Sequence, residues 1–161
     1  MDITAVKQRL DELDQIMATH TIDSPAFSDA AHEQSALMFR DIPIRETQII
    51  ARNMPTNFSN ELMAKMIVAA HNGKPLSDVL EMPIPVKIGY LVRWGRRQKD
   101  LSQAQLAEQL DMTQSQIAKI ESAANGVTAE VMGKLAKALD VTFTIAPNDP
   151  VLNKTNPKKA S

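Results

Sequence analysis

The chain has 161 residues, no cysteine and a formal net charge of −1, and 43% of its residues are hydrophobic. This composition is typical of a protein with a sizeable core, and it excludes disulfide frameworks, thiol catalysis and cysteine-ligated zinc. No apolar run reaches the roughly 18 residues of a membrane span, and the polar N-terminus lacks the apolar stretch of a secretory signal. We therefore expect a soluble, cytoplasmic protein.

Charge is distributed unevenly along the chain. Residues 1–82 contain 7 Lys and Arg against 12 Asp and Glu, a net charge of −5, whereas residues 83–161 contain 11 against 7, a net charge of +4. A basic segment attracts polyphosphate and an acidic segment is repelled by it. The C-terminal half is therefore the half that suits nucleic acid.

A first helix is predicted over residues 3–17, where apolar residues recur at spacings of three and four. This apolar stripe must be buried against the rest of the chain or against a second protein chain. It consists of Ile3, Val6, Leu10, Leu13 and Met17.

A second helix is predicted over residues 25–39, because Ser24 is a good N-cap and Pro25 suits the first helical position. Residues 44–50 are rich in β-branched side chains, yet their spacing favours a short helix over a strand. The predicted buried residues of the second helix are Phe27, Ala31, Leu37 and Met38.

A further helix is predicted over residues 58–71, ending at the stop signal Asn72-Gly73. Residues 76–80 add a short turn. The segment 81–86 contains two prolines and indicates an extended linker, so we place a domain boundary there. The predicted apolar face of the helix consists of Leu62, Met63, Met66, Ile67 and Ala70.

Residues 1–82 thus form a small helical N-terminal region that we expect to bind a partner or to oligomerise. The region holds seven of the nine methionines, which serve as ordinary core residues or as adaptable contacts on a partner surface. The three histidines lie far apart without metal-ligand spacing, and no phosphate loop, nucleophile elbow or HExxH motif occurs. We expect no cofactor, no metal site and no enzymatic activity.

The C-terminal half begins with a helix predicted over residues 86–98, with Ile88, Leu91 and Val92 facing inward. Cations gather at its end, where they either interact with the helix dipole or meet DNA phosphates. They are Arg93, Arg96, Arg97 and Lys99.

Two short capped helices follow. Ser102 and Gln105 have the spacing of a capping box, and Thr113 and Gln116 repeat it after the tight turn at Asp111-Met112. Two short helices joined by such a turn follow the helix-turn-helix plan, in which the second helix enters the major groove of DNA.

The outward face of the second of these helices suits base recognition. Gln114 can bond adenine, Lys119 suits guanine, and Ser115 is permissive. The first turn is uncharged, so phosphates and bases can approach it without repulsion.

A fourth helix is predicted from the N-cap Thr128, with Val131, Leu135 and Leu139 buried. Residues 141–145 then alternate as a β-strand, and a lone strand needs a partner, for which a twin chain is the obvious candidate. This domain spans residues 83–146, and residues 147–161 are predicted to form a flexible basic tail.

Residues 91–145 resemble the Xre-type domain of lambdoid phage repressors. The resemblance rests on the stretches LSQAQLAEQL, MTQSQIAKIE and LAKALDV. The turn departs from the family at Asp111, where glycine is common, but aspartate tolerates a left-handed backbone. The resemblance implies a mainly α fold, a lambda-repressor-like helix-turn-helix domain with a C-terminal β-strand.

Within that family the chain is most similar to HipB-like and HigA-like antitoxins of type II toxin–antitoxin systems, which share a hydrophobic strand after the last helix. The similarity implies a homodimeric repressor that binds an inverted-repeat operator in double-stranded DNA, autoregulates its operon and neutralises a protein toxin. It leaves open whether the dimer forms through residues 141–145 or through the N-terminal helix. The alternative is a free-standing phage or mobile-element regulator whose N-terminal region oligomerises or senses a ligand.

By the family motif, Gln103 meets a phosphate, and Gln114, Ser115 and Lys119 face base edges. Helix capping alone is the other interpretation for Gln103 and Gln116. The full set of expected DNA-binding residues is Ser102, Gln103, Thr113, Gln114, Ser115, Gln116 and Lys119.

Overall fold

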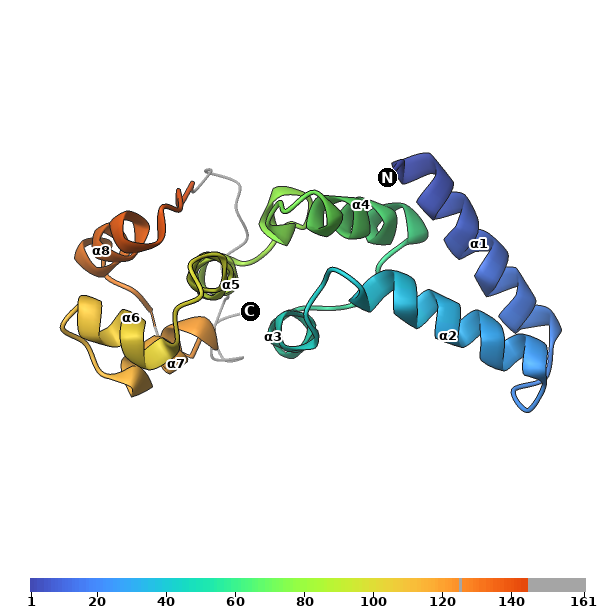
Figure 1. Cartoon of the computed structure of the whole chain (residues 1–161), viewed down its shortest axis with the longest axis horizontal. Helices are drawn as coiled ribbons and strands as arrows, with labels where there is room; N and C mark the ends of the chain where they lie inside the picture. Colours follow the sequence, from blue (N-terminus) through green and yellow to red (C-terminus); the bar gives the residue numbers. More distant parts are fainter. Residues whose placement is uncertain (125, 145–161) are drawn as a thin grey trace, which may run out of the picture. The chain divides into compact units, whose positions relative to one another are not determined.

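The computed structural model describes residues 1–124 and 126–144, which contain eight α-helices and one 3-10 helix (Figure 1). By contacts the chain divides into two compact units. Unit 1 consists of Met1–Ala51 and Pro55–Leu80, and unit 2 takes Arg52–Met54 and the chain from Glu81 onward. The fold is mainly helical.

Two general findings concern the described residues alone. None of their helices is both long enough and apolar enough to cross a membrane. They also bring together no group of three or more His, Cys, Asp or Glu that could hold a metal ion. The predicted basic tail, residues 147–161, lies outside the described part of the chain.

Side-chain caps start three of the four α-helices of unit 1, and Ser24, the cap of α2, was predicted from the sequence. The Asp2 carboxylate accepts a hydrogen bond from the backbone N–H of Ala5 at 2.9 Å, and Ser24 and Ser59 cap the next helices in the same way. The region around residues 44–50 is helical, as its spacing favoured. The elements are α1 (Ile3–Thr19), α2 (Pro25–Phe39), α3 (Ile44–Asn53), α4 (Asn60–His71) and η1 (Leu76–Asp78).

The apolar stripe of α1 is buried within unit 1, because α1 packs against both α2 and α4. Val6, Leu10 and Leu13 lie in its core, whereas Ile3 remains 39% exposed. Of the two partners that the sequence left open for this stripe, the structure supplies the intramolecular one.

Two burial predictions for unit 1 need correction. In α2, which packs against α1 and α4, the four predicted core residues are only half-buried, and the buried residue is Ala30. In α4 burial is wider than one stripe, because α4 contacts α1, α2 and η1. Its buried residues are Ala64, Met66, Ile67, Val68 and Ala69.

The prediction of an extended linker over residues 81–86 is wrong at its end. The first helix of unit 2 begins at Ile84, with Pro85 in its opening turn. Proline is tolerated there because the first backbone N–H groups of a helix have no partner within it. The helices of unit 2 are α5 (Ile84–Gln98), α6 (Gln103–Gln109), α7 (Gln114–Glu121) and α8 (Ala129–Leu139).

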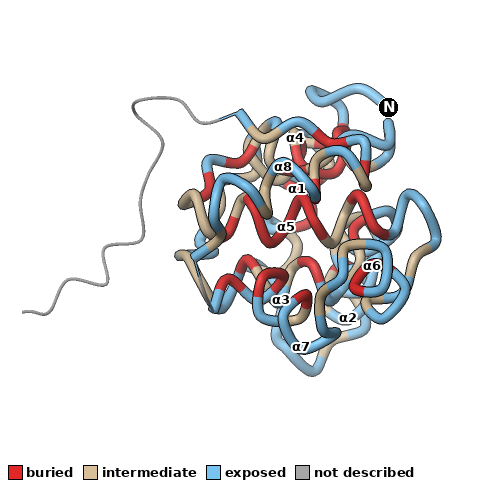
Figure 2. Tube along the Cα trace, turned by 90° about the vertical axis from the view of Figure 1, so that its left-hand side faces the viewer, coloured by how far each residue is buried: buried red, intermediate tan, exposed pale blue. Residues whose placement is uncertain are grey.

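The core of unit 2 gathers around α5, along which Figure 2 shows buried positions recurring. Gly89 lets the backbone of α5 approach that of α7 closely: a Cβ there would lie 2.5 Å from the carbonyl oxygen of Ile120. Gly95 likewise leaves room for two side chains: a Cβ there would lie 2.8 Å from the side chain of Val141 and 3.1 Å from that of Leu139. The buried cluster consists of Ile88, Val92, Leu106, Ala107, Ile117, Ile120, Leu135, Leu139 and Val141.

The predicted β-strand over 141–145 is absent from its described part, residues 141–144; Ile145 lies outside the described residues. The predicted alternation is nevertheless visible, because Val141 is buried and Phe143 half-buried against the core, while Thr142 and Thr144 are exposed. A strand is defined by its hydrogen-bonded neighbour. Among the described residues of the single chain, Val141 donates to the carbonyl oxygen of Ala136 at 3.2 Å, and no neighbouring strand pairs with residues 141–144.

Candidate nucleic-acid interface

Helices α6 and α7 are each fixed at their start by a complete capping box. The Ser102 hydroxyl accepts from the N–H of Gln105 at 3.0 Å, and the Gln105 side chain accepts from the N–H of Ser102 at 2.8 Å. Thr113 and Gln116 repeat this exchange at 3.2 and 2.8 Å. Both boxes were predicted from the sequence and are confirmed.

The turn between the two helices depends on a left-handed residue. Asp111 has a φ of +53°, the conformation that its place in the turn required. Ala107 of α6 and Ile117 of α7 are both buried in the core cluster of unit 2. Short α6, a four-residue connection and α7 thus form a helix-turn-helix pair, of which α7 packs on α5.

An ion pair inside unit 2 holds the pair of helices to α5. Arg96 of α5 donates to Glu121, the last residue of α7, through Nε at 2.6 Å and Nη2 at 3.2 Å, and to the carbonyl oxygen of Leu101 at 2.6 Å. Arg96 is 9% and Glu121 3% exposed. A second cation, Arg93, lies 3.5 Å from the same carboxylate.

This pairing corrects one expectation. Arg96 was grouped with cations that meet the helix dipole or DNA phosphates, but its guanidinium is directed inward at Glu121. Sequence reasoning did not single out Glu121. The available signal was a carboxylate at the end of a short helix whose neighbours, Ile117 and Ile120, are core residues; a buried charge of this kind requires a partner.

Gln103 belongs to the same network. Its side-chain amide donates to Glu121 Oε2 at 2.9 Å. Because a carboxylate only accepts, the NH₂ group of Gln103 must face it, and one amide hydrogen is left for another acceptor. The start of α6 is thereby tied to the end of α7.

The expected base-reading residues lie on the exposed side of α7, with Gln114 and Ser115 in its first turn and Lys119 in its last turn. Gln114, Ser115 and Lys119 are all exposed, and the ammonium of Lys119 forms no ion pair with any other described residue. Gln116 is exposed too, but its side-chain oxygen is used in the capping box. The two caps, Ser102 and Thr113, are exposed at their helix starts and are likewise occupied by backbone N–H groups.

This surface, which we call the α7 face (Gln114, Ser115 and Lys119), combines amide, hydroxyl and ammonium groups on a helix held rigidly at both ends. Such groups can donate to and accept from the edges of bases in the major groove. A rigid mounting reduces the entropy lost when these side chains meet a partner.

Comparison with known proteins gives one match. Residues 92–145 match a helix-turn-helix family model, which spans α6, α7 and α8 and the second half of α5. No curated protein and no solved structure matches the chain. The matched family is a DNA-binding regulator fold and not an enzyme family. Residues 92–145 are therefore a helix-turn-helix domain of the Xre type, which suggests a DNA-binding transcription regulator.

Proposed function

We propose that the chain is a sequence-specific transcriptional repressor that reads an operator through the α7 face. The observation that carries this proposal is the α7 face itself: three exposed side chains with base-reading chemistry on a helix that two capping interactions and the Arg96–Glu121 pair hold in place. Ser102, Gln103, Thr113 and Gln116 flank this face and contact the phosphate backbone or support the helices that do.

The repressor acts as a homodimer. Val141 and Phe143 pack on the core of unit 2 while Thr142 and Thr144 face outward. The backbone of residues 141–145 can then pair with the same segment of a second chain across a two-fold axis. Two recognition helices about 34 Å apart, one turn of B-DNA, would meet the two halves of an inverted repeat.

Its biological role is that of an antitoxin that autoregulates its operon in the cytoplasm and neutralises a protein toxin. The hydrophobic segment directly after the last helix, on which the resemblance to HipB-like and HigA-like antitoxins rests, favours this role, and acidic unit 1 offers a surface on which a toxin can bind. The alternative, a free-standing regulator with a sensing region, is favoured by a different observation, an apolar pocket in unit 1.

Selection of binding sites by the purified full chain from random DNA duplexes tests the proposal. We expect the selected sequence to be an inverted repeat. A copy of this repeat should overlap the protein's own promoter, where footprinting should show two protected half-sites. A single unsymmetrical site would refute the dimer, and no enriched sequence would refute the repressor.

A second experiment separates antitoxin from free-standing regulator. The product of a reading frame adjacent to this gene is expressed with and without the chain. Growth arrest that the chain relieves supports the antitoxin role. A harmless neighbour, or arrest that the chain does not relieve, supports the free-standing regulator.

A further inference from the structure

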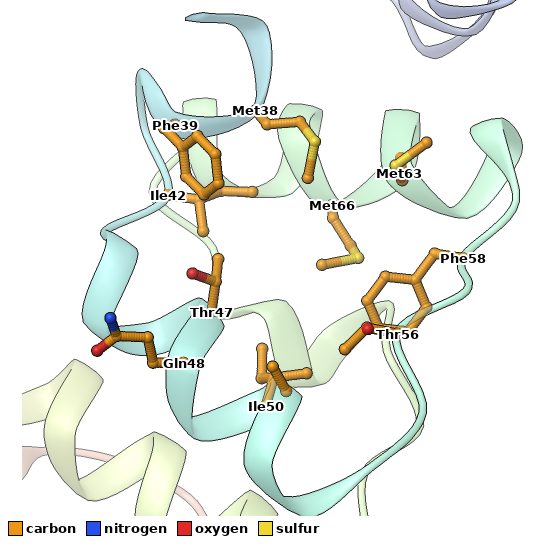
Figure 3. Close-up of a pocket in the computed structure, with 11 residues that line it drawn as sticks. Met38, Phe39, Ile42, Thr47, Gln48, Ile50, Thr56, Phe58, Met63 and Met66 are labelled. Carbon is orange, nitrogen blue, oxygen red and sulfur yellow. The ribbon is translucent and has the colours of Figure 1, made fainter. Parts of the chain in front are cut away.

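Unit 1, which lies outside the helix-turn-helix domain, contains an open pocket of about 300 Å³. It lies wholly within unit 1, between the end of α2, α3, the segment after α3, and α4 (Figure 3). The side chains of Met66 and Phe58 point into the space from one side, and Ile50 and Thr47 face them from α3.

The lining of the pocket is apolar and uncharged. Three of its eleven lining residues are polar (Thr47, Gln48 and Thr56), and the other eight are methionine, phenylalanine, isoleucine or alanine. Its floor is fixed, because Ile42, Ile50 and Met66 are at most 4% exposed. Its rim includes Phe39, which is 41% exposed, so a large aromatic ring is in contact with solvent beside an apolar hollow.

The few polar groups lie where they can orient a ligand. The Thr47 hydroxyl already donates to the carbonyl oxygen of Ile44 at 2.6 Å, and its oxygen can still accept. The side chains of Gln48 and Thr56 are exposed and form no hydrogen bond within the described part of the chain. A largely apolar cavity with a small number of polar groups at one side is the usual form of a small-molecule site.

We propose that unit 1 binds one small, uncharged, mainly apolar molecule in this pocket. The volume admits about ten non-hydrogen atoms, at the roughly 30 Å³ that a water-sized group occupies in a liquid. The absence of charge from the lining excludes an ionised ligand, because a buried charge without a partner is strongly unfavourable. Three methionines and two phenylalanines favour an aromatic or branched hydrocarbon with one hydroxyl or amide group.

The shape of the pocket argues for a small molecule over a partner helix. A helix that binds in a groove uses several anchors spaced at i, i+3, i+4 and i+7 along an elongated surface. Here four segments surround one open hollow, which offers a place for a single anchor. The proposal does not depend on DNA binding, so either can fail without the other.

The test uses the full chain and two matched probes, 2-naphthol and the anion 2-naphthoate, at pH 7. We expect saturable binding of one 2-naphthol per chain, measured by titration calorimetry, and binding of 2-naphthoate at least about tenfold weaker because of the cost of burying its charge. Equal affinity for both probes, or uptake that does not saturate, would overturn the proposal.

Two substitutions test whether 2-naphthol binds in the pocket. Ala51 is exposed and lines the pocket, so Ala51→Phe should fill it and weaken 2-naphthol binding at least about tenfold. The control is Ala36→Phe, at an exposed alanine of α2 that does not line the pocket. Equal binding of 2-naphthol by the two variants would overturn the assignment. So would a change in the oligomeric state of Ala51→Phe without a loss of 2-naphthol binding, because it would show that a protein chain occupies the pocket.

A measurement on the unmodified sequence covers the case in which Ala51→Phe does not fold. Methyl-labelled methionine spectra should show shifts for Met38, Met63 and Met66 on addition of 2-naphthol. Met112 and Met132, which pack in unit 2, should not move. Shifts shared by all five methyl groups, or absent from the first three, would contradict the site.

Discussion

Arg96 and Glu121 lie 25 residues apart in the sequence and meet in a buried ion pair with two hydrogen bonds, of 2.6 and 3.2 Å. The pair joins the first helix of unit 2 to the last residue of α7. Both groups are almost fully buried and have lost their hydration, so each charge is stabilised by its interaction with the other.

Glu121→Gln should therefore lower the free energy of unfolding of unit 2 by roughly 3–5 kcal/mol, since it leaves the Arg96 cation buried without a counter-charge. Urea denaturation followed by the fluorescence of Trp94, the only tryptophan, reports on this unit. The matched control is Glu130→Gln, which breaks an exposed pair with Lys134 and should have no measurable effect. Equal stability of the two variants would show that the buried pair contributes nothing.

The close approach of α5 and α7 gives a second prediction. Gly89→Ala would place a methyl group 2.5 and 2.9 Å from the backbone oxygens of Ile120 and Glu121, which cannot move without displacing α7. We expect a loss of about 1–3 kcal/mol in the same urea experiment.

Gly133→Ala is its control, because that glycine lies in α8 with nothing within 4 Å of the added methyl group. It should raise stability by about 0.5–1 kcal/mol, the usual difference between glycine and alanine in a helix. If both substitutions stabilise unit 2, then α5 and α7 are not in close contact at Gly89.

The helices were largely predictable because their signals are local. Ser24 and Thr128, like the two capping boxes, start helices where the sequence places them, since a cap involves residues only three positions apart. The left-handed Asp111 followed in the same way from the turn.

The parts that could not be predicted depend on residues far apart in the sequence. Nothing within α5 shows that Arg96 faces Glu121, or that Gly89 lies against a carbonyl of Ile120. The pocket of unit 1 is likewise assembled from four segments. The strand over 141–145 failed in its described part for a related reason, because a strand requires a neighbour that a single sequence pattern does not supply.

Acid should weaken unit 1 through Glu33. Two hydrogen bonds from Arg9, each of 2.7 Å, lower the pKa of the Glu33 carboxyl below its ordinary value. A lowered pKa in the folded state stabilises the fold above the unfolded pKa, and this contribution is lost as the pH falls through the folded pKa. Glu33→Gln should therefore be less stable than the natural sequence at pH 7. The two should be equally stable at a pH below the folded-state pKa of Glu33, where the carboxyl is protonated.

Circular dichroism during urea denaturation at several pH values measures this difference, because the only tryptophan and the only tyrosine both lie outside unit 1. In an Arg9→Gln background the same substitution should have no effect that varies with pH between neutral and acid. A pH-dependent difference that persists there would assign it to another group.

Thr144→Pro tests the proposed dimer. Proline removes a backbone N–H and disrupts strand pairing, while Thr144 itself is exposed and not part of the core. We expect light scattering to show a shift toward monomer, with unchanged helix content by circular dichroism and weaker operator binding. A variant that stays dimeric with normal operator affinity would place the dimer contact outside residues 141–145.

Operator recognition through α7 is tested most directly by the substitution Gln114→Ala. Gln114 is exposed at the first position of α7, where its amide can bond two atoms of an adenine edge. Its control is Gln109→Ala, an exposed glutamine at the far end of α6. Fluorescence anisotropy on the selected operator and its single-base variants should show that Gln114→Ala loses roughly 1–3 kcal/mol and relaxes base preference at one position per half-site, while Gln109→Ala binds normally. If Gln114→Ala keeps both the affinity and the base preference of the natural sequence, α7 is not the recognition helix.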